Sequence, residues 1–353
     1  MPPGENRIRN AGANREPVVM TPAPVPAPRV KKPTATPKRS AATVTPKPAH
    51  GAVKRTVVRR AGAPSPRRAV RVRTLTAEAK RTAVDAGRLM DAGAPVRLCF
   101  FRADAPGYDV LPDGERTPMS KMIFGGQGGE VRLKLYSSIL WLGARKPYAV
   151  ENKPAAAWAR LFGLSEPDKN GAQRVGAAID WLVDNGFMLA GRGRGRPARL
   201  VPRHERGSGD DYYRPQEGDK KNIDWWITLP QDLWSRGWMA VLSGAALASL
   251  IIIWDETDRH DDTDKEKRVG RGGIEYQVMT KVPWVWLAES VLVKRYRLSY
   301  DVWEKGTLEL EKLGLIGRRL RGDVTGFGPR QRRRQVRLDL DALERGPEVV
   351  SGR

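Results

Sequence analysis

The sequence contains few of the residues from which enzymes and metal proteins build their sites. Cys99 is the only cysteine, which excludes a disulfide framework and any thiolate zinc site within one chain. The histidines, His50, His204 and His260, are widely separated, so neither a paired-histidine nicking site nor a catalytic triad is evident. The longest apolar run, residues 245–254, is shorter than the roughly 20 residues that span a bilayer, and it predicts a buried helix instead.

Two stretches have part of a ligand-binding pattern but lack its essential residues. Residues 124–129 are rich in glycine, yet the Lys-Ser/Thr pair of a phosphate loop is missing. Residues 260–264 are acidic, yet they lack the spaced carboxylates and terminal Glu of a calcium loop, so Arg259 to Gly273 is predicted to be a charged surface loop. We therefore expect a protein that is not an enzyme and has no catalytic residues, cofactor or metal.

Acidic residues are also in short supply. The chain has 63 Lys and Arg against 40 Asp and Glu, a formal charge of +23 and a pI near 10.4, which favours a polyanionic partner. Residues 1–74 hold 17 of the basic residues and 13 of the 27 prolines, but only two acidic residues. Such a segment cannot bury enough apolar surface to offset its ordering entropy, so we predict a disordered basic arm. The arm adds affinity for phosphates or acts only as a solubilising tail.

The expected location is cytoplasmic and nucleoid-associated. A single cysteine fits a reducing compartment, and the beginning of the sequence has many prolines and no continuous apolar segment of the secretory kind. No membrane partner is expected.

A helix-turn-helix pattern runs from Lys294 to Ile316. Ser299 is a good N-cap for a helix over 299–313, because its side-chain oxygen can accept from the orphan N–H groups of the first turn. Val302, Gly306, Leu310 and Leu313 recur at helical spacing and so predict one core-facing side, and Gly314 suits the left-handed position past the helix end. Two segments of strand character follow, 315–320 and 335–340, and the loop between them is rich in arginine.

The same landmarks occur earlier in the chain. A Leu-Ser pair at 164–165 precedes a predicted helix over 170–185, in which Val175, Ile179 and Leu182 share one face. Gly186 ends that helix four residues after Leu182, as Gly314 follows Leu310. The residues at 165–170 lengthen the early turn by six positions. An arginine-rich tip at 192–199 again follows.

Both patterns resemble the winged helix-turn-helix superfamily. The resemblance implies a mainly α fold with small β-hairpin wings, an α+β class, present here as two tandem domains. We expect the arm at 1–74, a helix and turn-rich connector at 75–129, the first winged domain at 130–202, a linker at 203–222, the second winged domain at 223–345 and a tail at 346–353. Further predicted helices cover 76–92, 133–142, 154–164 and 283–296, and strands begin near 96 and 225.

In winged helix proteins generally, the third helix commonly enters the major groove while the wing meets the backbone or the minor groove. In the early domain, Asn and Gln can pair with adenine edges and Arg with guanine edges. The alternative is a solvated polar helix face. The Arg-Gly-Arg-Pro stretch at 194–197 resembles an AT-hook core, which contacts the minor groove. The alternative is an ordinary glycine-rich hairpin tip. The predicted DNA-binding residues here are Lys169, Asn170, Gln173, Arg174, Arg192, Arg194, Arg196 and Arg199.

The later third helix carries a more mixed charge. Asp301, Glu304, Glu309 and Lys312 are expected on its outward face, a partly acidic set that phosphates would partly repel. We therefore expect its wing, rather than the helix, to contact phosphate. The alternative is that this helix face binds a protein partner. The tryptophans at 225, 226, 284 and 286 are predicted to pack in the core rather than to stack on bases. The predicted DNA-binding residues here are Tyr300, Lys305, Arg321, Arg330, Arg332, Arg333 and Arg334.

As an architecture, residues 130–342 resemble plasmid replication initiators of the iteron-binding type. The resemblance implies a sequence-preferring protein of double-stranded DNA that initiates replication of a plasmid or mobile element. A winged helix transcriptional regulator is an alternative. Another is a protein-interaction adaptor in a replication or segregation assembly, with loose DNA affinity. Expected partners are double-stranded DNA, with a homodimer or replication and segregation proteins as further candidates.

Overall fold

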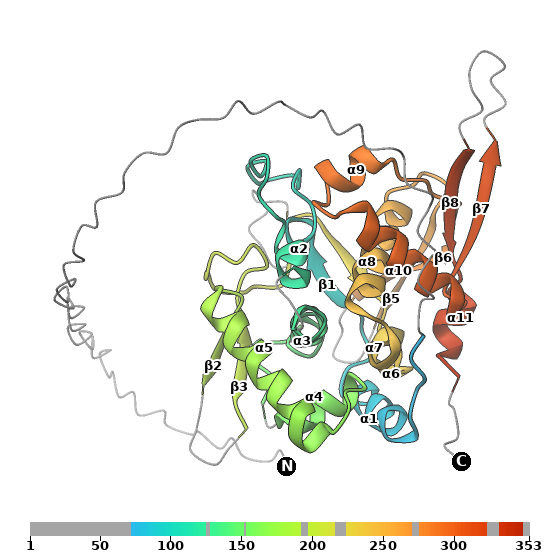
Figure 1. The fold of residues 1–353 in the computed structure, drawn as a ribbon. Helices are drawn as coiled ribbons and strands as arrows, with labels where there is room; N and C mark the ends of the chain where they lie inside the picture. The colour runs from blue at the N-terminus through green and yellow to red at the C-terminus, as the bar shows by residue number, and fades with distance from the viewer. Residues whose placement is uncertain are drawn as a thin grey trace, which may run out of the picture. The chain divides into compact units, whose positions relative to one another are not determined.

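The computed structural model describes residues 72–124, 128–151, 153–191, 197–215, 224–269, 275–322 and 332–348. The chain divides into two units, Met1–Ser65 and Pro66–Arg353, and every described residue belongs to the second. The predicted arm thus lies almost wholly outside the described residues. Within them, α-helices combine with two-stranded antiparallel sheets, a composition compatible with the α+β class expected from the sequence (Figure 1).

The first elements form the segment that was predicted as a connector. Helix α1 (Ala77–Gly87) begins at Thr76, whose hydroxyl accepts from the Ala79 N–H at 3.2 Å. Strand β1 (Ala94–Arg97) and a short 3₁₀ turn (Leu98–Phe100) follow. Helix α2 (Pro118–Ile123) has Pro118 in its first turn and the Thr117 hydroxyl as its cap, bonded to the Ser120 N–H at 3.3 Å. With only six residues inside a turn-rich stretch, α2 is too short for its apolar spacing to stand out, and it was not predicted.

Three helices and a hairpin then make an early unit. These are α3 (Gly129–Leu142), α4 (Ala155–Leu161), a π-helical turn (Pro167–Gly171) leading into α5 (Ala172–Asp184), and strands β2 (Met188–Gly191) and β3 (Arg199–Pro202). Val150, between α3 and α4, bridges to Leu200 of β3, so an extended segment lies beside the hairpin. The predicted core face of α5 is confirmed, since Val175, Ile179 and Leu182 are buried.

The later unit repeats this order of elements. After β4 (Trp226–Leu229), α6 (Asp232–Ser235) and α7 (Trp238–Val241) come α8 (Gly244–Asp258), α9 (Glu289–Lys294) and α10 (Tyr300–Lys312). Strands β7 (Ile316–Gly322) and β8 (Arg332–Leu338) form the hairpin, and α11 (Leu340–Arg345) follows. Val285, between α8 and α9, bridges to Val336 of β8. The apolar run at 245–254 lies inside α8 and is buried, as predicted.

Helices α8 and α10 pack closely because Gly306 lies at their contact. A Cβ atom at this position would meet the Ser249 hydroxyl oxygen at 2.2 Å and the Ala245 carbonyl oxygen at 2.4 Å. The predicted cap of α10 is confirmed, since the Ser299 side chain accepts from the Val302 N–H. The predicted left-handed glycines are confirmed too, with φ of +75° at both Gly186 and Gly314.

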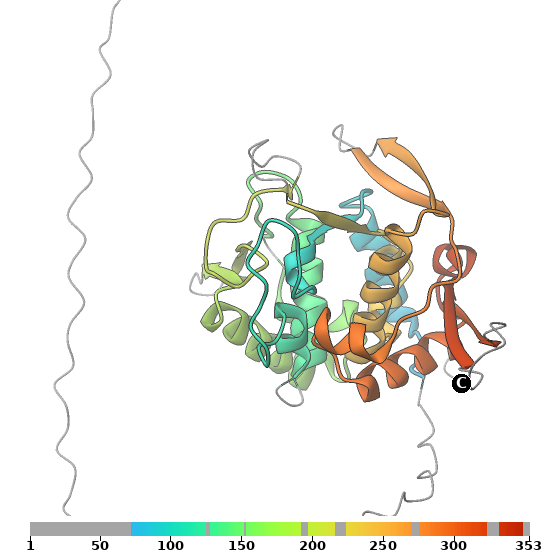
Figure 2. The same ribbon diagram turned by 90° about the horizontal axis from the view of Figure 1, so that it is seen from above.

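One prediction for the later unit is wrong. Residues 259–273 do not form only a loop, because Asp264–Val269 is strand β5 and pairs with β6 (Glu275–Lys281). Every residue of β5 is exposed, so neither face carries the apolar alternation by which a strand is predicted. Pairing with β6 stabilises the strand instead, and the hairpin extends away from the helices (Figure 2).

The early unit, α3 to β3, and the later unit, β4 to α11, are joined by contacts between aromatic rings and between strands. Strand β1 pairs with β4 in an antiparallel sheet, and α3 packs against α8. The Trp141 ring of α3 stacks on the Trp234 ring of α6 with centroids 4.8 Å apart. The Trp234 indole N–H donates to the Ser138 hydroxyl at 2.8 Å, so this buried indole is satisfied across the junction.

A buried ionic network lies at the same junction. The Arg97 side chain is 0% exposed, and it donates to the carboxylates of Glu205 at 2.5 Å and Asp224 at 2.9 Å, and to the Tyr213 carbonyl at 2.7 Å. Burial opposes the charged form of Arg97, but the two carboxylates outweigh it and raise the pKa of its guanidinium. Glu205 and Tyr213 belong to the segment that was predicted as a linker. That segment therefore contributes to the core of the described structure.

Candidate nucleic-acid interface

The early candidate site lies on the π-helical turn and the first turn of α5. Lys169, Asn170, Gln173 and Arg174 are exposed, while the residues that face the core point the other way. Gly171 lies between the two segments in close contact, since a Cβ atom there would approach the Ala159 Cβ at 3.0 Å and the Ser165 carbonyl oxygen at 3.1 Å. Because a side chain at this position would crowd α4, glycine allows α5 to lie against α4 with its polar side outward.

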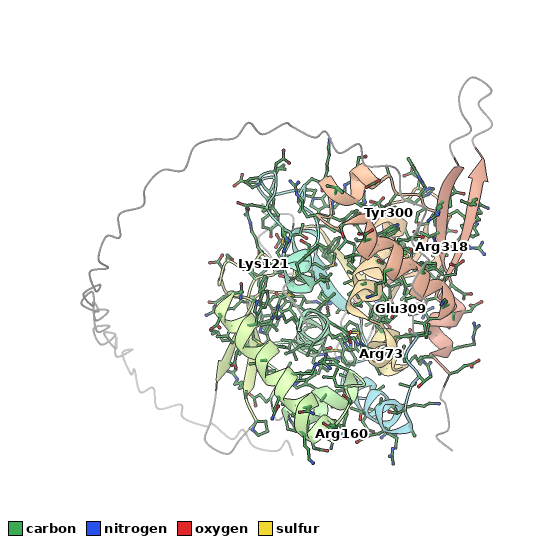
Figure 3. All side chains as sticks on the ribbon, viewed as in Figure 1. Arg73, Lys121, Arg160, Tyr300, Glu309 and Arg318 are labelled. Carbon is green, nitrogen blue, oxygen red and sulfur yellow. The ribbon has the colours of Figure 1, made fainter. Side chains whose placement is uncertain are left out.

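Three of these four side chains have no intramolecular partner in the part of the chain that the structure describes. They are Lys169, Gln173 and Arg174, and none of them makes a side-chain hydrogen bond or an ion pair. The Asn170 amide instead donates to the Glu166 carboxylate. Next to them, Arg160 of α4 bonds to the carboxylates of Asp168 at 2.6 Å and Glu78 at 2.7 Å (Figure 3). Among the described residues, the Lys169 ammonium and the Arg174 guanidinium are therefore the uncommitted cations of this site.

The early hairpin offers less that can be described. Arg192, Arg194 and Arg196 lie outside the described residues, so the DNA contact expected of this tip stays a prediction. Arg199 is exposed on β3 and donates to the Glu151 carboxylate at 2.9 Å. An exposed ion pair of this kind is worth at most about 1 kcal/mol, so Arg199 can exchange Glu151 for a phosphate at little cost.

Arginines of the β7–β8 hairpin bind acidic side chains of α10. Glu304 accepts from Arg334 of β8 at 2.6 Å and from Arg318 of β7 at 3.3 Å (Figure 3). Partial burial raises the pKa of the Glu304 carboxyl, but the charges of Arg318 and Arg334 outweigh it, so its pKa is lowered. The Tyr300 hydroxyl lies 3.4 Å from Arg334. Lys305 is exposed and makes no described contact of this kind.

One residue expected on this face is not there. Glu309 is only 3% exposed, and its carboxylate accepts from the Ser243 N–H at 2.7 Å and from the Ser243 hydroxyl at 2.6 Å (Figure 3). Ser243 is the N-cap of α8, so Glu309 completes that cap from α10. The outward face of α10 is therefore less acidic than predicted.

The register of the later hairpin brings arginines opposite one another. Arg321 of β7 pairs with Arg333 of β8, Gly322 with Arg332, and Leu320 with Arg334. Arg330 lies outside the described residues. The basic character of the β7–β8 hairpin is thus concentrated near its open end.

The predicted residues form two separate sets. The early set lies on the unit where α5 packs on α3, and the later set on the unit where α10 packs on α8. Arg318, which binds Glu304 and Glu311, was not predicted from the sequence. The signal that could have indicated it is the position of Arg318 in a strand that follows a helix of alternating charge. In the described part of the chain, no cluster of His, Cys, Asp and Glu could hold a metal ion, and no helix is long and apolar enough to cross a membrane.

The prediction that tryptophans 225, 226, 284 and 286 pack in the core is wrong for two of them. Trp225 is 54% exposed and Trp286 is 41% exposed. Trp284 is instead covered by cations, with Arg319 at 4.2 Å and Arg337 at 5.0 Å from its ring centroid. Exposed indoles of this size are candidates for contact with a partner.

Comparison with protein-family models, with curated proteins and with solved structures finds no match for this chain.

Proposed function

We propose that this protein binds double-stranded DNA with a sequence preference and uses α5 to contact base edges. The observation that carries the proposal is the face of α5, where Gln173 and Arg174 are exposed without a partner among the described residues. These residue types make bidentate contacts with adenine and guanine edges in the major groove. The chain's charge of +23 supports a polyanionic partner.

The order of elements supports assigning both units to the winged helix-turn-helix superfamily. In each unit, two helices and a short extended segment precede a long helix and a two-stranded hairpin. In the proposal, α5 and α10 are the third helices, and the β2–β3 and β7–β8 hairpins are the wings. The arm at 1–74 adds affinity that does not depend on sequence. Initiation of replication of a plasmid or mobile element is the role proposed, with transcriptional regulation as its alternative.

A specific observation favours a second candidate function for the later unit. Arg334 and Arg318 bind Glu304, so two of the wing's cations are already neutralised. A wing of this kind is suited to a protein partner, as in an adaptor of a replication or segregation assembly. In that case the early unit would bind DNA and the later unit would not.

The experiment begins with selection of preferred duplexes from a random library by the full chain. Affinities for the selected duplex and for a scrambled duplex are then measured by fluorescence anisotropy. We expect Arg174→Ala to relax the preference at one base position by about 5- to 150-fold, which is the ~1–3 kcal/mol of a bidentate base contact. Arg81→Ala is the matched control, because Arg81 is exposed on α1, has no described partner and carries the same charge.

Comparison of Arg174→Ala with Arg81→Ala distinguishes the loss of a base contact from the loss of one positive charge. An equal loss on both duplexes for Arg174→Ala would make Arg174 a phosphate contact, and the absence of any selected sequence would overturn the sequence preference itself.

A further inference from the structure

A cleft of about 740 Å³ lies between β4, the end of α8 and the β5–β6 hairpin. Trp254 and Asp258 of α8 line its floor, residues 225–228 one wall, and Lys265, Lys267, Tyr276 and Met279 the other. Its volume is within the range of small-molecule sites, about 300–1,000 Å³. The elements that form it are visible from above in Figure 2. The cleft contains none of the predicted DNA-binding residues, which lie on α5 and the β2–β3 hairpin and on α10 and the β7–β8 hairpin.

Aromatic side chains dominate this cleft. Trp225, Trp226, Trp254 and Tyr276 all line it, and Trp225 is 54% exposed. An indole left this open is not accounted for by core packing, because Trp234 and Trp238 supply the large buried side chains of the same unit. Aromatic faces bind flat, π-rich groups by stacking, and nucleobases are the commonest such groups among polyanions.

The charges of the cleft suit an anion. Its two carboxylates are already bound: Asp258 by Lys265 at 3.0 Å, and Asp224 by Arg97 at 2.9 Å and by the Tyr108 hydroxyl at 2.7 Å. Lys267 is exposed and has no hydrogen bond or ion pair within the described residues. Arg214 adds a second positive charge to the lining, and the Lys267 ammonium is a cation beside the indoles that has no described partner. Stacking surfaces next to a free cation match a base that carries phosphate.

The cleft is also separate from the α10 surface. Ala245 and Ser249 of α8 contact α10 at Gly306. Trp254 follows Ala245 by about two and a half helical turns, so it lies on the opposite side of α8. A ligand in the cleft would therefore not compete for the residues that the proposed duplex binding uses.

We propose that this cleft binds a nucleobase with its phosphate, stacked on Trp225 and paired with Lys267. The base comes either from an unpaired stretch of single-stranded nucleic acid or from a free nucleotide. The site is independent of the duplex-binding function proposed above.

The test measures binding of a fluorescein-labelled oligothymidylate to the full chain by anisotropy. Trp225→Ala weakens this binding by about 5- to 150-fold, the range that loss of one stacked base produces, and Trp225→Phe restores most of it. Lys267→Gln weakens it more than Arg268→Gln does. Arg268 is the matched control because it is the next residue of β5, carries the same charge and points to the other side of the strand.

Further arms identify the source and can overturn the proposal. Displacement of the oligonucleotide by a nucleoside monophosphate, but not by ribose 5-phosphate, assigns the site to free nucleotides. Displacement only by unlabelled single strands assigns it to single-stranded nucleic acid. The proposal is overturned if Trp225→Ala binds as the parent does, if Lys267→Gln and Arg268→Gln have equal effects, or if both cleft variants weaken duplex binding as much as single-strand binding. Circular dichroism and thermal unfolding verify that each variant is folded.

Discussion

At the scale of single residues, buried side chains with distant partners decide what α10 presents to solvent. Glu309 was expected on the outward face because it is charged, although its spacing, seven residues after Val302 and four before Leu313, places it beside the core face. Its partner is Ser243, far away in the chain, and only the packing of α10 on α8 brings the two together. Ser299 and Gly314 were predicted correctly because an N-cap and a left-handed glycine are local requirements.

We expect Glu309→Ala to lower the free energy of unfolding by about 1–3 kcal/mol. The reason is that the Ser243 N–H and hydroxyl lose a buried acceptor, and an unsatisfied buried donor costs that much. Urea denaturation of the full chain, followed by far-UV circular dichroism, measures the change. Glu311→Ala is the control, since Glu311 is exposed and contacts only Arg318, and it should change the stability by ~0.5 kcal/mol or less. Equal effects of the two changes would remove Glu309 from its capping role.

At the scale of elements, periodic segments were predicted and non-periodic ones were not. Helices α5, α8 and α10 each have an apolar face or a continuous apolar run, and all three were placed within a few residues. Helix α2 has only six residues, and strand β5 has no apolar face. Their stability depends on a cap, on Pro118 and on strand pairing, which the hydrophobic pattern does not record. The exposed Trp225 was missed because an indole next to a strand is usually a core residue.

The β7–β8 hairpin allows a prediction about how the later unit meets DNA. Glu304→Gln removes the carboxylate that holds Arg334 and one of the two that hold Arg318, so the Arg334 guanidinium becomes available to phosphates while Arg318 keeps its bond to Glu311. If this hairpin contacts DNA, duplex affinity rises and the plot of log affinity against log salt steepens by up to about one unit per phosphate gained. Anisotropy titrations at several salt concentrations measure both.

A control with the same change in charge separates the hairpin from general electrostatics. Glu344→Gln alters an exposed residue of α11 that has no described ion pair. It should raise duplex affinity less and leave the slope nearly unchanged. If Glu304→Gln behaves like Glu344→Gln, the later unit does not use its hairpin on DNA, and the adaptor function becomes the better proposal.

At the scale of the whole molecule, the two units share one core. The segments predicted as connector and linker supply Arg97, Tyr108, His204, Glu205 and Tyr213 to the junction, and β1 pairs with β4 across it. A sequence interpreted as two separate domains cannot show this, because a charged residue such as Arg97, at the end of a short strand, is ordinarily a surface residue. Since both units depend on the same buried network, they should unfold together rather than one after the other.

His204 makes that shared core sensitive to pH. Its Nδ1 accepts from the Arg206 N–H at 3.2 Å, and its Nε2 lies 3.1 Å from the Tyr108 hydroxyl, an arrangement that requires the neutral ring. Burial, and next the charge of Arg97, lower the pKa of His204 from 6.5 to about 4, against the opposing effects of Asp224 and Asp210. Between these values the unfolded chain binds a proton that the folded protein does not. Stability therefore falls as the pH decreases from about 6.5 to about 4.

The size of this loss follows from the difference in pKa. A fall in the pKa of His204 from 6.5 to about 4 corresponds to ~3 kcal/mol, and this loss is reached when the pH approaches the folded-state value. Urea denaturation at a series of pH values should show a single transition whose midpoint falls across this window. His204→Asn, which keeps a polar side chain that can accept the Arg206 N–H but takes up no proton, should flatten the fall, whereas His260→Asn, at an exposed ring, should leave it as steep as in the parent protein. A profile that His204→Asn does not flatten would show that another group controls the acid sensitivity, and two separate transitions would show that the units do not unfold as one.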